Sequence, residues 1–210
     1  MKVLANDGVS QSGIDALTNA GIEVITTKVA QEQLENYINE NNISVLLVRS
    51  ATTARKALID ACPGLKIIGR GGVGMDNIDV TYAREKGLSV INTPAASSSS
   101  VAELVFAHLF GGVRYLYDSN RNMPLDGDTR FKDLKKNYAK GSELRGKTIG
   151  IIGFGRIGRE VAKIALGCGM KVIASDNYVD TANITLDFFD GQKVTLEVKT
   201  KPIDELIQQS

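Results

Sequence analysis

A glycine-rich turn between an apolar run and a helical pattern is the feature that most constrains the fold of this chain. The turn is Gly153-Phe154-Gly155-Arg156-Ile157-Gly158, and it follows the apolar run Thr148–Ile152 directly. In a strand–turn–helix unit, Gly153 permits the tight turn, Gly155 lets a pyrophosphate approach the backbone, and Gly158 lets the helix pack on the strand. The pattern therefore predicts a βαβ unit that binds a dinucleotide.

A carboxylate at the end of the next predicted strand indicates which dinucleotide binds. The strand Lys171–Ser175 ends at Asp176, 18 residues after Gly158. A carboxylate at this position accepts hydrogen bonds from the hydroxyls of an adenosine ribose and repels a 2′-phosphate, so we expect NAD rather than NADP. The alternative is a glycine-rich turn that binds nothing; the strand, the helical pattern Arg159–Leu166 and the acid together argue against it.

Composition excludes several classes of protein. A net charge of +1 over 210 residues gives no electrostatic basis for binding nucleic acid or an acidic membrane surface. No apolar run is long enough to span a bilayer, and the N-terminus enters a predicted strand at once, unlike a signal peptide. Cys62 and Cys168 belong to no C-x-x-C pair, so we interpret both as reduced core residues of a cytoplasmic protein.

Apolar runs and amphipathic stretches alternate through the first part of the chain. The expected strands are Lys2–Ala5, Glu23–Thr26, Ser44–Val48, Leu65–Gly69 and Ser89–Asn92. The expected helices between them are Gln11–Ala20, Gln31–Asn41, Ala54–Ala61 and Ile78–Lys86. This alternation predicts an α/β fold, a flavodoxin-like parallel-sheet domain that occupies residues 1–95.

The second domain, residues 96–210, begins with a hinge and a long helix. Ser100-Val101-Ala102-Glu103 has the pattern of a capping box, which predicts a helix from Val101 to about Asn120. The segment Arg121–Arg145 has no clear period and is expected to form an exposed arm. From Lys147 onward we expect the first half of a Rossmann (doubly wound) domain, with strands Thr148–Ile152, Lys171–Ser175 and Lys193–Val198 and a helix Ile203–Gln208.

Arginines and glycines at two strand ends of the first domain predict an anion site. Ligands of open α/β sheets bind beyond the carboxyl ends of the strands, and Arg49 and Arg70 stand at two such ends. Guanidinium groups suit bidentate capture of phosphate or carboxylate, and the turn Gly71–Gly74 can direct successive amides at one anion. Solvated arginines beside a turn that binds nothing are the alternative.

No residue has the features of an acid–base catalyst. The single histidine, His108, lies in the apolar run Leu104–Phe110, and we interpret it as a packed structural residue. No Ser-His-Asp order, metal-ligand cluster or Walker loop is present in the sequence.

Four segments together resemble the D-isomer-specific 2-hydroxyacid dehydrogenases. They are Arg49–Thr52, Gly69–Asp79, Val101–Glu103 and Leu144–Gly153. The resemblance runs from residue 1 to the end, is weaker around residues 180–200, and is closest to members that act on D-3-phosphoglycerate. It implies an NAD-dependent oxidoreductase that oxidises D-3-phosphoglycerate to 3-phosphohydroxypyruvate, a step of serine biosynthesis and thus of amino-acid biosynthesis.

The resemblance also implies a set of site residues and a partner. Residues implied to bind a phosphorylated 2-hydroxy acid are Arg49, Ser50, Arg70, Gly72, Val73 and Gly74. Residues implied to bind the cofactor are Ser100 and Val101 beside the nicotinamide, the turn residues Gly153, Gly155, Arg156, Ile157 and Gly158, and the ribose acid Asp176. The arm before Leu144 matches a segment used in dimerisation, so the resemblance implies a homodimer.

Two departures from the family pattern limit what is carried over. Ala96 and Ser97 replace a frequent Gly-Asn pair, and the family's catalytic arginine, glutamate and histidine would fall after Ser210. We therefore assign no catalytic residue to this chain and no metal, and expect it to be an inactive fragment of a longer product. The alternatives are a dehydrogenase for glyoxylate, hydroxypyruvate or lactate, and a non-catalytic regulator that senses NAD(H).

Overall fold

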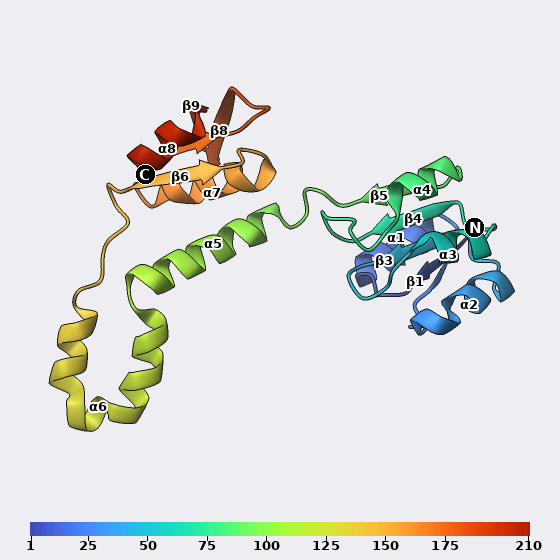
Figure 1. Ribbon diagram of the computed structural model, residues 1–210, viewed down its shortest axis with the longest axis horizontal. Coiled ribbons are helices and arrows are strands. Elements are labelled where there is room, and N and C mark those ends of the chain that lie inside the picture. The colour runs from blue at the N-terminus through green and yellow to red at the C-terminus, as the bar shows by residue number, and fades with distance from the viewer. The chain divides into compact units, whose positions relative to one another are not determined.

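The computed structural model describes residues 1–210, which form two compact units, Met1–Ser97 and Ser98–Ser210 (Figure 1). No helix among these residues combines the length and the apolar character that a bilayer crossing requires.

The first unit is built on a five-stranded parallel sheet in the order β2-β1-β3-β4-β5. Its strands are β1 (Lys2–Ala5), β2 (Glu23–Ile25), β3 (Val45–Val48), β4 (Ile67–Arg70) and β5 (Ser89–Asn92). Its helices are α1 (Gln11–Asn19), the 3-10 turn η1 (Gln31–Gln33), α2 (Leu34–Glu40), α3 (Lys56–Ala61) and α4 (Val80–Glu85). This strand order is that of flavodoxin-like sheets, which confirms the predicted fold class.

The core of this unit follows from side-chain alternation along the strands. Leu4, Leu46, Ile68 and Val90 are paired in register across β1, β3, β4 and β5, so they form one apolar row on one face of the sheet. All four are buried and belong to the same core as apolar residues of α2 and α3. This packing fixes the strands, and with them the loops that follow their carboxyl ends.

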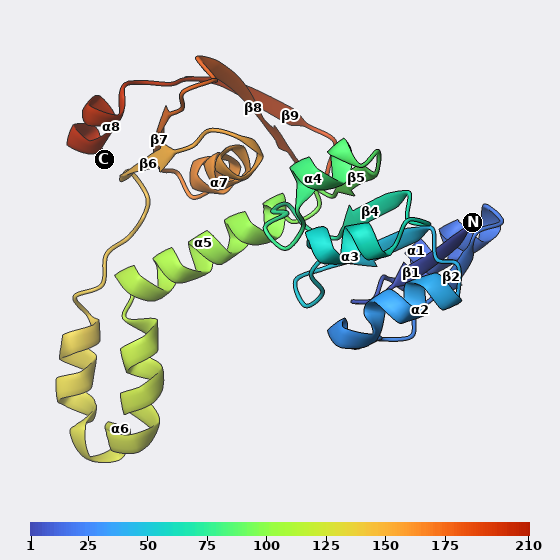
Figure 2. The same ribbon diagram turned by 45° about the vertical axis from the view of Figure 1, so that its right-hand side comes forward.

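The second unit combines helices with two small sheets (Figure 2). Its elements are α5 (Ser98–Val113), α6 (Leu116–Tyr138), β6 (Thr148–Ile152), α7 (Arg156–Gly167), β7 (Lys171–Ser175), β8 (Thr181–Asp187), β9 (Lys193–Lys199) and α8 (Ile203–Gln209). Strands β6 and β7 are parallel, and α7 lies between them along the chain, as in a βαβ unit. Strands β8 and β9 form an antiparallel hairpin. The core gathers around the fully buried Phe154, with Ala102 and Phe106 from α5 and Val161 and Ala162 from α7.

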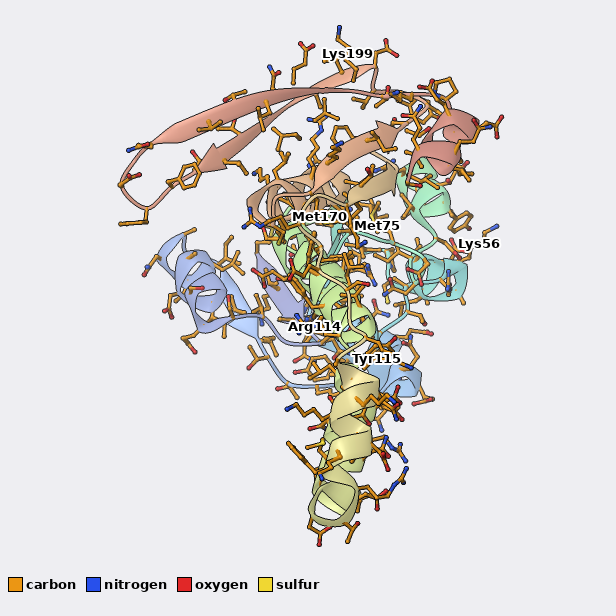
Figure 3. The ribbon with its side chains drawn as sticks, turned by 90° about the vertical axis from the view of Figure 1, so that its left-hand side faces the viewer. Lys56, Met75, Arg114, Tyr115, Met170 and Lys199 are labelled. Carbon is orange, nitrogen blue, oxygen red and sulfur yellow. The ribbon has the colours of Figure 1, made fainter.

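The predictions of a helix from Val101 to about Asn120 and of an irregular arm after it are wrong in three respects. Helix α5 already begins at Ser98, so Ser100 lies within its first turn and is not the predicted cap. It ends at Val113, because Tyr115 adopts a left-handed conformation with φ +54° at the junction to α6 (Figure 3). The segment expected to be an irregular arm is helical as far as Tyr138.

Contacts between distant residues explain why the helical arm was not predicted. Helix α6 bends where Arg130 has φ −121° and ψ 22°, and both ribbon views show two limbs that run side by side. Nδ2 of Asn122 donates to the Tyr138 hydroxyl at 3.0 Å, and the ring centroids of Tyr115 and Tyr138 lie 6.4 Å apart. These contacts order a segment whose local sequence, with Pro124 inside it, has no amphipathic period.

Two further interpretations are corrected. Strand β8 was not predicted, although Ala182, Ile184 and Leu186 alternate with polar residues along it. His108 is exposed, although it was expected to be packed. Ala102 and Phe106 lie on the buried side of α5, and His108, two positions after Phe106, lies on a different side of the helix. The alternation of apolar and polar residues indicates β8, and the spacing of the buried residues along α5 indicates that His108 is exposed.

Candidate functional site

The glycine-rich turn joins β6 to α7 and presents backbone amides to solvent. Gly153 has φ +90°, a conformation that favours glycine, and Gly155 is the N-cap of α7. The first amides of a helix have no partner inside the helix, and those of Arg156 and Ile157 have no acceptor elsewhere in the chain. Both amides are therefore available to an anion at the positive end of the helix dipole.

The other two glycines of the turn fit a dinucleotide for different reasons. A Cβ atom at Gly158 would lie 2.2 Å from the carbonyl oxygen of Gly153 and 3.2 Å from Cγ2 of Ile151, so only glycine permits this approach of α7 to β6. A Cβ atom at Gly155 would meet nothing within 4 Å. Open space over Gly155, beside free amides, is what a pyrophosphate needs.

Asp176 closes the turn at the end of β7. Its Oδ2 accepts the amide of Phe154 at 2.6 Å, and its Oδ1 accepts the amides of Tyr178 at 2.8 Å and Val179 at 3.1 Å. The amides of Tyr178 and Phe154 are the main reason that the pKa of Asp176 lies below its usual value. The carboxylate is ionised at neutral pH and keeps lone pairs that can accept ribose hydroxyls.

A pocket of about 770 Å³ lies next to this carboxylate. It is lined by the ends of β6 and β7 and by the residues that follow β9, among them Ile152, Tyr178 and Pro202. Ile152 is 64% exposed and Tyr178 is 95% exposed. Large apolar side chains that face an open pocket beside an ionised carboxylate suit a nucleoside, whose base is apolar on both faces.

Ser100 and Val101, implied to lie beside the nicotinamide, are in the first turn of α5. Ser100 is exposed and Val101 is partly buried. The next residue, Ala102, shares the core of this unit with α7, the helix that follows the glycine-rich turn. The Oγ of Ser98 in the same turn is buried without a hydrogen-bond partner.

The second candidate region is the rim of the five-stranded sheet in the first unit. A pocket of about 360 Å³ is lined there by residues from the carboxyl ends of β1, β3, β4 and β5. Arg49 and Arg70 both contribute to it, together with Gly8, Ile91 and Asn92. The topology thus brings four strand ends to one hollow, as expected for an open parallel sheet.

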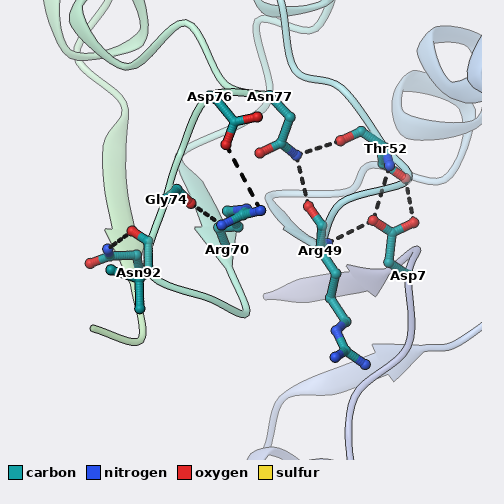
Figure 4. Close-up of polar contacts among 9 residues, drawn as sticks. Asp7, Arg49, Thr52, Arg70, Gly74, Asp76, Asn77 and Asn92 are labelled. Atoms are coloured by element: carbon teal, nitrogen blue, oxygen red, sulfur yellow. Dashed lines mark hydrogen bonds and ion pairs between the residues drawn. The ribbon is translucent and has the colours of Figure 1, made fainter. Parts of the chain in front are cut away.

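The guanidinium groups of Arg49 and Arg70 do not meet in this structure (Figure 4). Arg49 is exposed, whereas the side chain of Arg70 is 15% exposed and lies against the segment Gly71–Gly74, here named the glycine-rich loop. Nη1 of Arg70 donates to the carbonyl oxygen of Gly74, and Nη2 lies 4.0 Å from Oδ1 of Asp76. Nε of Arg70 is buried without a partner.

Only part of the loop from Gly71 to Gly74 has free amides. The amide of Gly71 donates to Val48 at 2.9 Å and that of Gly72 donates to the carbonyl oxygen of Arg70 at 3.0 Å. The amides of Val73 and Gly74 donate to no group of the chain. Asn92 steadies this end of the loop, because its Nδ2 donates to the carbonyl oxygen of Val73 at 2.7 Å.

Sequence reasoning did not find the polar network beneath Arg49. Oδ2 of Asp7 accepts the amides of Arg49 at 2.6 Å and Thr52 at 3.0 Å, and Oδ1 accepts the Thr52 hydroxyl at 2.7 Å. Burial raises the pKa of Asp7, but the hydrogen bonds from the Thr52 hydroxyl and the backbone amides outweigh it and leave the pKa below its usual value. Nδ2 of Asn77 donates to the carbonyl oxygens of Arg49 and Thr52 at 2.8 and 2.6 Å.

Residues 1–210 offer no arranged acid–base pair at either region. The exposed His108 forms no hydrogen bond, and no group of three or more histidine, cysteine, aspartate or glutamate side chains is placed to hold a metal ion. Both cysteines are free thiols; Cys62 is buried and Cys168 is half-buried. The arrangement as described can bind anions and a dinucleotide.

The chain is similar in sequence to known proteins. Residues 3–204 match the family model for the catalytic domain of D-isomer-specific 2-hydroxyacid dehydrogenases. A hydroxypyruvate reductase of Thermotoga maritima is 40% identical over 190 residues, which cover 90% of this chain and 60% of that protein. A D-3-phosphoglycerate dehydrogenase of Methanocaldococcus jannaschii is 38% identical over 179 residues, which cover 85% of this chain and 33% of that protein.

A solved structure supports the fold. The crystal structure of an NAD-dependent formate dehydrogenase from Staphylococcus aureus, in complex with NAD, matches all of this chain and 63% of its own length. The TM-score is 0.73 and the sequence identity is 24%, so the similarity concerns the fold. The chain therefore spans between a third and two thirds of the length of these three proteins.

Proposed function

Because this chain belongs to the family of D-isomer-specific 2-hydroxyacid dehydrogenases, which are NAD-dependent enzymes acting on a CH–OH group, we propose that it contributes to the oxidation of D-3-phosphoglycerate. The product is 3-phosphohydroxypyruvate, and the reaction belongs to serine biosynthesis in the cytoplasm. The first unit binds the substrate and the second binds part of the cofactor.

The glycine-rich turn with Asp176 is the observation that carries the cofactor assignment. The free amides of Arg156 and Ile157 face open space above Gly155, and the ionised Asp176 is positioned by the turn itself. These amides would hold the pyrophosphate of NAD, and Asp176 would accept the ribose hydroxyls and repel a 2′-phosphate. NAD held there would supply the acceptor for the hydride from C2 of the substrate.

The rim of the sheet supplies two subsites for a substrate with two anionic groups. The free amides of Val73 and Gly74 take the carboxylate, as amides do in a backbone nest. Arg49 and Arg70, which line the same pocket, take the phosphate, for which guanidinium groups provide charge and bidentate geometry. To bind the phosphate, Arg70 gives up its hydrogen bond to the carbonyl oxygen of Gly74. Ser50 is the residue after Arg49 on the same loop. The groups that move the hydroxyl proton are assigned to no residue of 1–210.

The helical arm supports a homodimer as the working state. Helix α6 exposes several large apolar side chains, Leu116 at 61%, Tyr117 at 70%, Leu125 at 77% and Phe131 at 51%. Apolar surface of this extent on a projecting helix pair is typical of an interface between subunits. Sedimentation of the gene-length protein as a monomer at micromolar concentration would contradict the proposed dimer.

Oxidation of NADH by the gene-length protein tests the proposed function. 3-Phosphohydroxypyruvate is compared with hydroxypyruvate, glyoxylate and pyruvate, and a strong preference for the phosphorylated acid is expected. Replacing Arg70 with alanine should raise KM mainly for the phosphorylated acid, by about 10-fold or more, because a charge-assisted contact is lost. Equal losses for all four acids would contradict the assignment of Arg70 to phosphate.

A second candidate is reduction of hydroxypyruvate without a phosphate site, favoured by the 40% identity to the Thermotoga maritima reductase. Comparable rates on phosphorylated and plain acids would support it. A non-catalytic sensor of NAD(H) is supported only if NADH binds and none of the four acids is reduced.

A further inference from the structure

Asn77 connects the two loops that form the substrate pocket. It lies three residues after Gly74, the last residue of the glycine-rich loop, whose Val73 and Gly74 carry the free amides. Its side-chain Nδ2 donates both of its hydrogens to the other loop, to the carbonyl oxygens of Arg49 at 2.8 Å and Thr52 at 2.6 Å (Figure 4). One side chain therefore ties the backbone of the Arg49 loop to the chain segment that follows the free amides.

The loop that carries Arg49 is held on its other side as well. Asp7 accepts the amides of Arg49 and Thr52, and Asn6 donates to the Thr52 hydroxyl at 2.8 Å. Asn6, Thr52 and Asn77 are three of the five buried polar residues of the whole chain. Burying a polar group costs free energy unless it is hydrogen-bonded, so a concentration of such groups beneath one exposed loop indicates that its position matters.

The glycine-rich loop itself does not depend on the Asn77 side chain. Asn92 donates to the carbonyl oxygen of Val73 at 2.7 Å, and before phosphate binds Arg70 also donates to the carbonyl oxygen of Gly74. The backbone carbonyl of Asn77 accepts the amide of Ala54 at 2.9 Å, a contact that any residue at this position would keep. Loss of the carboxamide therefore loosens the Arg49 loop, which Asp7 then holds from one side only, and leaves the Val73 and Gly74 amides in place.

We propose that Asn77 is a positioning residue that sets the separation between the carboxylate subsite and the phosphate subsite, and so selects phosphorylated acids. The inference rests on the proposed function, because it assigns the amides to the carboxylate and Arg49 to the phosphate. A plain 2-keto acid occupies only the amide end and does not sense the separation. A phosphorylated acid spans both ends, and a misplaced Arg49 weakens its binding.

The test compares two ligands with the same carbon skeleton in the gene-length enzyme. KM and kcat are measured for 3-phosphohydroxypyruvate, and hydroxypyruvate is measured by its competitive inhibition constant, which does not require turnover. For Asn77→Ala, we expect KM for the phosphorylated acid to rise about 5- to 30-fold, since two hydrogen bonds that hold the loop are lost. The inhibition constant of hydroxypyruvate and the dissociation constant of NADH should stay within about twofold, because neither ligand contacts the loop.

Two further variants keep the test decisive. Asn39→Ala removes a carboxamide that donates to the carbonyl oxygen of Ala61 at 2.9 Å, away from the pocket, and should leave all three constants unchanged. Asp7→Asn is nearly isosteric and loosens the same loop from the other side, so it should reproduce the selective rise in KM even if Asn77→Ala fails to fold. An equal weakening of both acids in Asn77→Ala or Asp7→Asn would overturn the inference while the proposed function stands. If the wild-type enzyme reduces none of the acids, the proposed function fails first.

Discussion

A single methyl group added at Gly158 tests whether close packing of α7 on β6 determines the conformation of the glycine-rich turn Gly153–Gly158, which we propose binds the cofactor. In Gly158→Ala, the new carbon would lie 2.2 Å from the carbonyl oxygen of Gly153, whereas ordinary contacts begin near 3.4 Å. The atom in the way belongs to the backbone of the turn, so no side chain can rotate to make room. Helix α7 must move away by about 1 Å, against a core that includes Phe154 and Val161.

The cost of that movement can be bounded. Forcing a methyl group into a packed interior costs about 1–3 kcal/mol of the free energy of unfolding. For a protein of this size, each kcal/mol corresponds to about 2–4 °C in Tm, so Tm should fall by roughly 2–12 °C. The turn carries the amides of Arg156 and Ile157, and a displacement of about 1 Å should weaken NADH binding by about 10-fold or more.

Gly167→Ala on the same helix is the matched control. A Cβ atom there meets nothing within 4 Å, and Gly167 lies in the last turn of α7 without positive φ. Alanine is the better helix former by about 1 kcal/mol or less, so Tm should stay the same or rise slightly. Thermal unfolding followed by circular dichroism, with NADH fluorescence titration, measures both effects. If Gly158→Ala unfolds and binds NADH as the wild type does, the close packing has no role in forming the turn.

Three further outcomes are expected. The pKa of Asp7 in the folded protein is below its unfolded value, so its stabilising contribution is complete above about pH 5 and is lost as pH falls through the folded pKa. In Asp7→Asn, the free energy of unfolding measured in urea should therefore fall less steeply between pH 6 and pH 3. An unchanged dependence of that free energy on pH would refute this. Asp176→Asn cannot accept the amides of both Phe154 and Tyr178 as well as the carboxylate does, so NADH affinity should fall about 10-fold, and unchanged affinity in a fluorescence titration would exclude the ribose role. Burial and the neighbouring Glu35 raise the pKa of Cys62 to about 11, so pulse alkylation of the native protein at pH 8 should label the half-buried Cys168 first, as peptide mass spectrometry can check. Equal labelling rates would show that the site around Cys62 opens readily.

Strands were predictable because each carries its own signal. The five apolar runs of the first unit and those of β6 and β7 all became strands, with ends within two residues of the expected positions. Burial on both faces of a parallel sheet requires continuous apolar runs, and the intervening glycines and amphipathic segments mark the helices. The fold class follows from that order alone.

Elements that depend on distant contacts were not predictable in the same way. The second limb of α6 is ordered by packing on the first, and a window of a few residues does not contain that information. The end of α5 depends on one left-handed residue, Tyr115, which few sequence rules anticipate for an aromatic side chain. Strand β8 is a different case, because the alternation of Ala182, Ile184 and Leu186 is local and its partner β9 was expected as a strand over Lys193–Val198.

The candidate site was predictable only in its most local parts. The turn from Gly153 to Gly158 and the arginines at strand ends follow from position along the chain. The side-chain hydrogen bonds of Asp7 and Asn77 join residues 25 to 45 positions apart, so their partners come together only when the sheet is assembled. Which amides of the loop from Gly71 to Gly74 are free likewise depends on the backbone path.

The contact between Asp176 and the amide of Phe154 has a consequence for how cofactor preference can change. One carboxylate both lines the pocket proposed for the ribose and anchors the turn whose amides are proposed to hold the pyrophosphate. Exchanging Asp176 for a small or basic residue, the obvious step toward NADP, would also release the turn. A change to NADP, in evolution or by design, therefore needs two substitutions in a fixed order. The first supplies a new acceptor for the Phe154 amide, and the second replaces Asp176.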